Sequence, residues 1–313
     1  MFVLTNKKGY VIIIDINIRW NIYAYLAYLI GFRPKQERRQ YQDREGEYLC
    51  YIMNKLMNTI FGKNNKKSAA QKQTVEVNSK KLLGSDLSFA ASEAYKRLRT
   101  NLVFSFAGET GCRVIGVTSS LRGEGKSTTS VNLAYSLATM NKSTLLIDAD
   151  MRLSNTHKLL ELNLAPGLSN LLVGVNDGTG LIVPSKLHRN LMVMTAGDTP
   201  PNPMELLSSK RMVMTLESLR AKFDYIIIDL PPIDAVADAL IVSKLVDGMV
   251  LVIRENYVDK HTLDNCIEQL RFHNANILGF VMNCAEVENK YYRKNYYRYG
   301  NNSSVGNTAI SND

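Results

Sequence analysis

Residues 112–150 constrain the fold most, because they contain a strand-like run, a glycine-rich turn, a helical pattern and a second strand-like run in immediate succession. The two runs, CRVIGVTSS (112–120) and STLLIDAD (143–150), are apolar on both faces, which is typical of strands in a parallel sheet covered by helices. Between them lies SLRGEGKSTTSVNLAYSLATM (120–140), in which the turn opens directly into the helix. This order of elements predicts a layered α/β fold.

The same strand-like pattern recurs along the chain to about residue 285. Four later runs are also apolar on both faces, namely LMVMTAG (191–197), YIIIDLPP (225–232), GMVLVI (248–253) and ILGFVMNC (277–284). Helical patterns precede the first strand and separate the later ones, at 86–106, 204–223, 238–246 and 261–274. The alternation predicts a doubly wound, mostly parallel sheet with helices on both faces.

Charge is distributed unevenly along the 313 residues. Residues 1–80 carry +8 of the net charge of +9, which leaves about +1 for the rest of the chain. We expect 1–85 to be a basic extension and linker, poorly ordered or interfacial, 86–285 to be the folded domain and 286–313 to be a flexible tail. The most apolar part of the extension, WNIYAYLAYLIGF (20–32), has 13 residues. A transmembrane helix needs roughly 20, so an interfacial segment is the favoured interpretation.

The turn SLRGEGKST (120–128) matches the phosphate-loop pattern G-x-x-x-x-G-K-[ST], except that Ser120 stands in place of the first glycine. Such a loop surrounds phosphate oxygens with backbone N–H groups, and the following helix adds its positive N-terminal end. The alternative is an ordinary tight turn, but the strand before it and the helix after it favour nucleotide binding and a fold of the P-loop NTPase type. We expect ATP to contact Gly123, Glu124, Gly125, Lys126, Ser127 and Thr128.

Three acidic residues follow two of the buried runs. Asp148 and Asp150 end one run, and Asp229 ends another. Acids at such positions often cap the next helix. Because ligands of open α/β sheets bind at the carboxyl ends of the strands, three carboxylates beside a phosphate loop instead favour a metal–phosphate site. We expect Ser127, Asp150 and Asp229 to bind Mg²⁺.

The segment KYYRKNYYRYG (290–300) lies beyond the last predicted strand, where its aromatic rings have no core to enter. It holds five of the sixteen tyrosines of the chain, which are Tyr291, Tyr292, Tyr296, Tyr297 and Tyr299. Exposed tyrosines between cations suit either of two roles. They are hydroxyl acceptors for a phosphoryl group, or they form an aromatic and basic patch that stacks single-stranded nucleic acid.

Together these motifs resemble the bacterial tyrosine kinases of the capsular polysaccharide type over about residues 85–300. The resemblance is carried by IDADMR after the phosphate-loop unit, by GDTPPNPMELLSS (197–209), by DLPPIDAVADALIVSKLVDGMVLVI (229–253) and by the tyrosine tail. It implies an ATP-dependent, Mg²⁺-requiring protein-tyrosine autokinase that acts in capsule or exopolysaccharide synthesis and export. The tail tyrosines are then its phosphoacceptors.

Phosphoryl transfer assigns a role to each site residue. Lys126 neutralises the phosphates, and Asp148 orients and deprotonates the incoming hydroxyl, although Asp148 and Asp150 could exchange roles. Arg152 either steadies the site or is an ordinary surface residue. Asn283 resembles the base-reading position of the family. Glu93, Lys96 and Arg99 resemble its ring-assembly pattern E-x-x-R-x-x-R, in which Lys96 replaces an arginine and loses the bidentate geometry with carboxylates.

The resemblance also implies partners. These are a membrane-embedded activator of the polysaccharide co-polymerase kind, a homo-oligomeric ring, protein substrates with tyrosines and a cognate phosphatase, at the inner face of the cell membrane. The main alternative is an ATPase switch of the septum-site or plasmid-partition type, which transfers no phosphate to protein. Those relatives place a lysine where this chain has Leu121. A nucleic-acid partner is not expected, because the folded part of the chain carries so little net charge.

Overall fold

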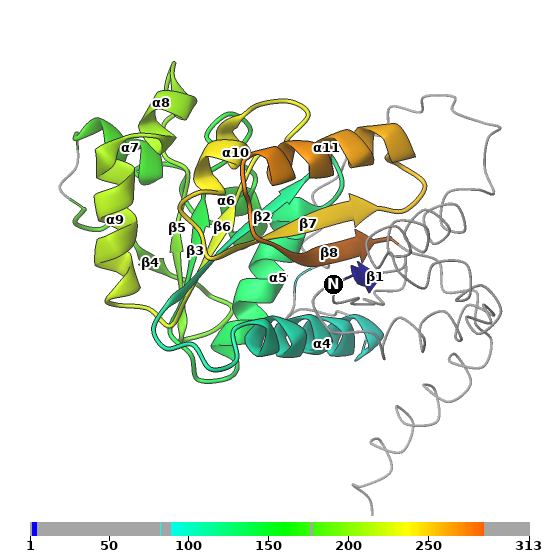
Figure 1. Cartoon of the computed structure of the whole chain (residues 1–313). Helices are drawn as coiled ribbons and strands as arrows, with labels where there is room; N and C mark the ends of the chain where they lie inside the picture. Colours follow the sequence, from blue (N-terminus) through cyan, green and yellow to red (C-terminus); the bar gives the residue numbers. More distant parts are fainter. Residues whose placement is uncertain (1, 5–81, 83–88, 176–177, 285–313) are drawn as a thin grey trace, which may run out of the picture.

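The computed structural model describes residues 2–4, 82, 89–175 and 178–284, which form one α/β layer structure (Figure 1). The described strands form a single sheet in the order β1-β8-β7-β2-β6-β3-β5-β4. Every pairing is parallel except that of β4 with β5, which is antiparallel. The strands are β1 (Phe2–Leu4), β2 (Arg113–Ser119), β3 (Thr144–Asp148), β4 (Val183–Pro184), β5 (Leu191–Met194), β6 (Tyr225–Asp229), β7 (Gly248–Arg254) and β8 (Ile277–Asn283).

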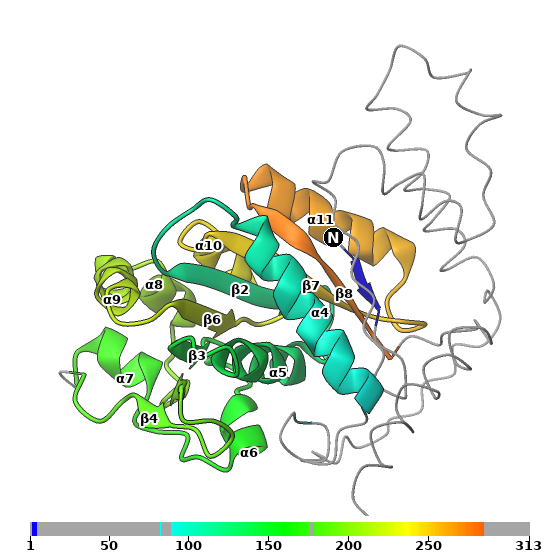
Figure 2. The same ribbon diagram turned by 90° about the horizontal axis from the view of Figure 1, so that it is seen from below.

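Helices cover both faces of the sheet (Figures 1 and 2). One face is covered by α4 (Phe89–Ser105), α5 (Lys126–Ala138) and α6 (Thr156–Leu160). The other face is covered by α7 (Leu168–Val173), α8 (Pro203–Leu207), α9 (Lys210–Arg220), α10 (Asp238–Val242) and α11 (Lys260–Phe272). The predicted fold class, a doubly wound and mostly parallel sheet with helices on both faces, is therefore confirmed.

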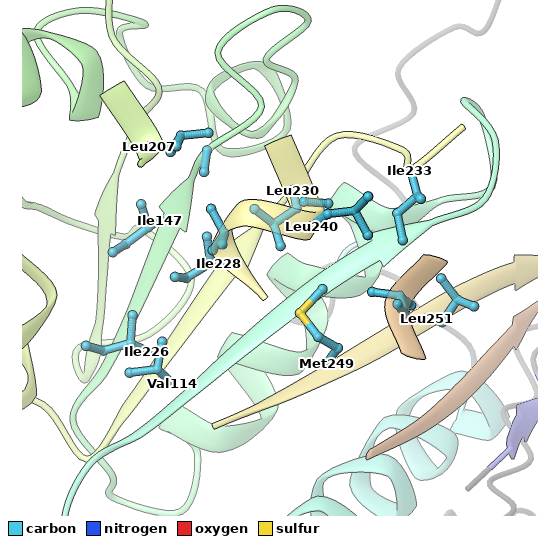
Figure 3. Close-up of a cluster of buried hydrophobic side chains, with 14 of the residues drawn as sticks. Val114, Ile147, Leu207, Ile226, Ile228, Leu230, Ile233, Leu240, Met249 and Leu251 are labelled. Carbon is cyan, nitrogen blue, oxygen red and sulfur yellow. The ribbon is translucent and has the colours of Figure 1, made fainter. Parts of the chain in front are cut away.

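Each face of the sheet carries its own hydrophobic core, because successive side chains of a strand point in opposite directions. In β6, Ile226 and Ile228 belong to the core under α8–α11, whereas Ile227 belongs to the core under α4 and α5. Figure 3 shows part of the first of these cores, with Val114, Ile228, Met249 and Leu251 among its labelled residues. Burial on both faces explains why the central strands appear in the sequence as continuous apolar runs.

The predicted elements differ from the structure at several places, and α6, α7 and β4 have no counterpart in the prediction. The single helical pattern at 204–223 is two helices, α8 and α9, because Ser209 accepts a hydrogen bond from Met212 N (3.2 Å) and caps a new helix start. The sequence predicts no strand at residues 2–4, but β1 pairs with β8 at the edge of the sheet, with Phe2 opposite Phe280.

The structure leaves part of the predicted organisation untested. Most of the basic extension and the tyrosine tail lie outside the described residues. Within the described part of the chain, no helix is long and apolar enough to cross a membrane.

Candidate active site

The phosphate loop leaves the carboxyl end of β2 and turns sharply into α5. Gly123 and Gly125 have φ values of +88° and +94°, in the left-handed region that glycine adopts without strain. Across the described residues, the backbone N–H groups of Gly123, Glu124 and Gly125 donate to no acceptor. Three free donors at the N-terminus of a 13-residue helix suit an anion such as a phosphate chain.

The Glu124 carboxylate holds the loop together from inside. It is fully buried and accepts hydrogen bonds from Leu121 N (2.6 Å) and Arg254 N (3.1 Å). Burial raises the pKa of this carboxyl, and the two backbone donors oppose that shift. The side chain of Glu124 is therefore engaged by hydrogen bonds within the protein, and only its backbone N–H is left to contact a nucleotide.

The three predicted acids converge beside the loop because of the strand order. β6 lies between β2 and β3, so Asp229 and Asp148 are register partners at neighbouring strand ends. Lys126, the first residue of α5, donates to Asp150 across 2.7 Å and has its Nζ 3.9 Å from Asp229 Oδ1. Ser127 is buried next to it, with its Oγ 3.5 Å from Lys126 Nζ. The structure thus brings every predicted catalytic side chain into one cluster.

This cluster holds three carboxylates around one ammonium group. Burial alone would lower the pKa of Lys126, but Asp229 and Asp150 outweigh it and raise the pKa, so the lysine stays charged. Burial, followed by the charge of Asp229, raises the pKa of Asp148 to about 7. Burial also raises the pKa of Asp229, against the attraction of Lys126. Three ionised carboxylates would exceed the charge of the one lysine, and the raised pKa values of Asp148 and Asp229 are the response to burial and to that imbalance.

Oxygen donors with surplus negative charge fit a hard divalent cation such as Mg²⁺. Among the described residues, no group of three or more His, Cys, Asp or Glu side chains is arranged to hold a metal ion. That is the normal situation for Mg²⁺, which keeps several waters and binds one or two carboxylates together with the phosphates of the substrate. Ser127, Asp150 and Asp229, the three residues that the sequence predicts as Mg²⁺ ligands, lie together beside the phosphate loop, and their role as ligands stays a prediction.

The structure distinguishes Asp148 from Asp150. Asp148 is fully buried, and its oxygens accept hydrogen bonds from Asp150 N (3.0 Å) and Ser154 Oγ (2.6 Å). Asp150 retains some exposure at 4% and faces Lys126. Asp148 therefore supports the segment that carries Asp150, whereas Asp150 lies toward the phosphate loop.

The chain is similar in sequence to a family of known proteins. Residues 112–277 match the family described as AAA domain. The tyrosine-protein kinase YwqD of Bacillus subtilis is 38% identical over 206 residues, which cover 66% of this chain and 86% of YwqD. The chain belongs to the bacterial tyrosine kinases.

Two further matches support this family membership. The tyrosine-protein kinase CpsD of Streptococcus agalactiae is 39% identical over 194 residues, which cover 61% of this chain and 82% of CpsD. The solved kinase domain of the Escherichia coli tyrosine kinase ETK superposes with a TM-score of 0.62 at 29% identity, covering 71% of this chain and 86% of that domain. The prediction of protein-tyrosine kinase activity is confirmed, and the alternative of a switch that phosphorylates no protein is set aside.

In this kinase, Arg152 contacts a residue that the sequence analysis misses. Its guanidinium forms a two-point contact with Asp238, Nε to Oδ2 at 3.0 Å and Nη2 to Oδ1 at 3.3 Å. Asp238 is buried at the start of α10, and its hydrogen bonds raise the pKa of Arg152. Arg152 therefore ties the acid-bearing segment after β3 to the segment after β6. No sequence signal distinguishes Asp238 from an ordinary helix-start acid.

Asn283 lies beside the phosphate loop at the end of β8. Its Nδ2 donates to Glu124 O (2.9 Å), and its Oδ1 accepts from Cys284 N (2.9 Å). A Cβ atom added to Gly125 would collide with this amide, which explains the glycine at the end of the loop. Thr128 is half-buried in the first turn of α5.

The three residues predicted to assemble a ring make contacts within the chain. Lys96 pairs with Glu93 at 2.6 Å. Arg99 donates to Ser136 O (2.9 Å) and Thr139 Oγ1 (3.0 Å), where a cation suits the C-terminal end of α5. The phosphoacceptor tyrosines lie outside the described residues.

A cleft of about 560 Å³ lies at the amino ends of the strands, on the edge opposite the phosphate loop. Its lining includes Phe104, Arg113, Lys142, Arg220 and Tyr225. Neither the phosphate loop nor the three acids contribute to this cleft, so it is not the site of phosphoryl transfer.

Proposed function

We propose that this kinase transfers the γ-phosphoryl group of ATP to tyrosines of its own carboxyl-terminal segment, namely Tyr291, Tyr292, Tyr296, Tyr297 and Tyr299. The observation that carries the proposal is the buried cluster of Lys126, Asp150 and Asp229 at the end of the phosphate loop. It combines a phosphate counter-charge with oxygen ligands for Mg²⁺, which is what phosphoryl transfer requires.

Lys126 makes contacts that a nucleotide would replace. Without phosphate, its ammonium group neutralises Asp150 at 2.7 Å. A bound triphosphate offers stronger negative charge, so Lys126 turns to the phosphates and leaves Asp150 free. Ser127 and Asp229 would hold the metal ion, which would neutralise charge on the phosphates. The loop N–H groups orient the phosphate chain.

A tyrosine hydroxyl has a reference pKa of about 10 and must pass its proton to a base as transfer proceeds. The contacts of the two acids that follow β3 favour Asp150, rather than Asp148, as this base. Asp150 contacts Lys126 at the end of the loop, so we assign it the role of the group that accepts the proton. Asp148, with both oxygens engaged, keeps Asp150 in place.

Membership in the family supports the proposed partners. We propose that a membrane-embedded activator holds the kinase at the inner membrane face, that the kinase assembles into a ring, that a phosphatase reverses its reaction, and that its output is capsule or exopolysaccharide synthesis and export. The basic segment 1–80 suits a site close to anionic lipid.

The test is to incubate the purified full chain with Mg-ATP and to map phosphotyrosine by mass spectrometry. We expect phosphate on the five tail tyrosines and a large loss of total phosphotyrosine when all five are changed to Phe. ATP hydrolysis without phosphotyrosine, or phosphotyrosine that is undiminished in the five-Phe variant, contradicts the proposal.

A further inference from the structure

Three successive carbonyl oxygens of the phosphate loop accept hydrogen bonds from side chains at the ends of β7 and β8. Tyr257 OH donates to Arg122 O (2.8 Å), and Arg254 Nη1 donates to Gly123 O (3.2 Å). Asn283 Nδ2 donates to Glu124 O (2.9 Å). No two of these contacts share a donor or an acceptor, so each carbonyl is held separately.

The donors are themselves held in place. The Arg254 guanidinium lies over the Tyr257 ring, 4.9 Å from its centroid, and the Arg254 backbone N–H donates to the buried Glu124 carboxylate. Tyr257 is 47% exposed, so its position depends on these contacts rather than on burial in the core. A Cβ atom on Gly123 would lie 3.1 Å from the Tyr257 hydroxyl, which shows how closely the loop approaches this side chain.

Contact with the carbonyls has a consequence on the other side of the loop. In a planar trans peptide unit the C=O and the following N–H point in opposite directions. Holding the carbonyls of residues 122–124 toward β7 and β8 therefore turns the N–H groups of Gly123, Glu124 and Gly125 the other way. Those N–H groups are the ones that donate to no described residue.

We propose that Arg254, Tyr257 and Asn283 form a carbonyl clamp, three positioning residues that pre-organise the phosphate loop for the nucleotide. None of the three needs to contact the reacting atoms. A loop that is already ordered loses less conformational freedom when phosphate binds, so the clamp raises nucleotide affinity. The clamp rests on one part of the proposed function, namely that a nucleotide binds at this loop. It does not depend on which tyrosines receive the phosphate.

Tyr257→Phe tests the clamp with the smallest change, because it removes the hydroxyl donor and keeps the ring under Arg254. The readout is Mg-ADP binding to the full chain by calorimetry, together with the melting temperature without nucleotide. We expect the dissociation constant to rise by about three- to tenfold, as for the loss of one hydrogen bond. We expect the melting temperature to change by no more than about 2 °C, because the residue lies outside the core.

Two further variants make the result specific. Asn283→Asp has the same shape but replaces the donor with an acceptor facing Glu124 O, so it should weaken Mg-ADP binding at least as much. Tyr225→Phe is the matched control, because Tyr225 lies at the opposite edge of the sheet and its hydroxyl has no side-chain hydrogen bond among the described residues. Its dissociation constant should equal that of the wild type.

Dissociation constants within about 1.5-fold of the wild type for both Tyr257→Phe and Asn283→Asp would overturn the clamp, whatever their melting temperatures. Because binding is measured with ADP, this failure is distinct from a failure of tail phosphorylation. If the wild type binds no Mg-ADP, the proposed function fails first, and the clamp fails with it.

Discussion

At the amino ends of its strands the sheet has three cations paired with partly exposed carboxylates, whereas at the carboxyl ends it buries three carboxyl groups around one lysine. The amino-edge pairs are Arg113 with Glu109 (2.7 Å), Lys142 with Asp224 (3.3 Å) and Arg220 with Asp247 (2.8 Å). The carboxyl edge has Lys126 against Asp148, Asp150 and Asp229.

The two edges differ in what their charges contribute. Exposed ion pairs contribute about 0–1 kcal/mol to stability each, and water screens what remains unpaired. Buried carboxylates in excess of their cations lower stability, because they lose hydration and repel one another. The carboxyl edge therefore holds carboxyl groups that stability does not require, which is consistent with the proposed site for a metal–nucleotide complex.

Lys126→Met should have the largest effect, because it removes the cation that contacts Asp150 and faces Asp229. We expect autophosphorylation to fall by at least about 100-fold, since the phosphates lose their counter-charge. The domain should still fold, because the two cores are unchanged. Its free energy of unfolding should drop by about 3 kcal/mol at pH 8, because the buried carboxyl groups lose their counter-ion.

Rates of phosphotyrosine formation and urea unfolding measure these two effects. Unchanged autophosphorylation would remove Lys126 from the site. Unchanged stability at pH 8 would mean that the cluster is more hydrated than its burial indicates.

A smaller effect is expected from pH in the absence of Mg²⁺ and nucleotide. The pKa of Asp148 is raised from 3.8 to about 7 in the folded protein. The folded state then binds the proton more tightly than the unfolded state, so this contribution to stability is complete below pH 3.8 and is lost as the pH rises through 7. Between pH 6 and pH 8 the loss should be about 1 kcal/mol.

Asp148→Asn should flatten this dependence. The comparison is urea unfolding of both proteins at pH 6 and pH 8, so that other titrating groups such as His157 cancel in the difference. An equal pH slope in the two proteins would show that Asp148 does not titrate in this range.

Lys142→Gln at the amino edge should have the smallest effect. Both partners of the Lys142–Asp224 pair are more than 40% exposed, at 47% and 41%. We expect the stability to change by less than about 0.5 kcal/mol and phosphotyrosine formation to stay within twofold. A loss of activity here would mean that the amino edge, with its cleft, takes part in catalysis.

The residues at the carboxyl edge are predictable from sequence for a physical reason. Lys126, Asp148, Asp150 and Asp229 all follow strand-like runs, and parallel strands bring their carboxyl ends to one edge of the sheet. The glycine-rich turn adds the loop. Local pattern and one topological rule are sufficient to place these side chains together.

The partners of the site residues are not predictable in this way. Arg152 forms hydrogen bonds with Asp238, which is 86 residues away in the sequence. Tyr257 donates a hydrogen bond to the carbonyl of Arg122, which is 135 residues away. Such pairs depend on the order of the strands in the sheet, which puts β7 and β6 on either side of β2. The sequence pattern predicts that these strands exist but does not give their order. The same limit applies to Arg99, whose contact with the end of α5 depends on how α4 packs.

One measurement tests most directly whether the buried charge of the carboxyl edge serves transfer to tyrosine. Lys126→Met subunits with an intact tail are mixed with active subunits whose five tail tyrosines are changed to Phe, and labelled ATP is added. We predict label on the tail tyrosines of the inactive subunit, because we expect the tail of one chain to enter the site of another. ATP hydrolysis by the active subunit with no label on those tyrosines, while the wild type likewise forms no phosphotyrosine, would contradict the account.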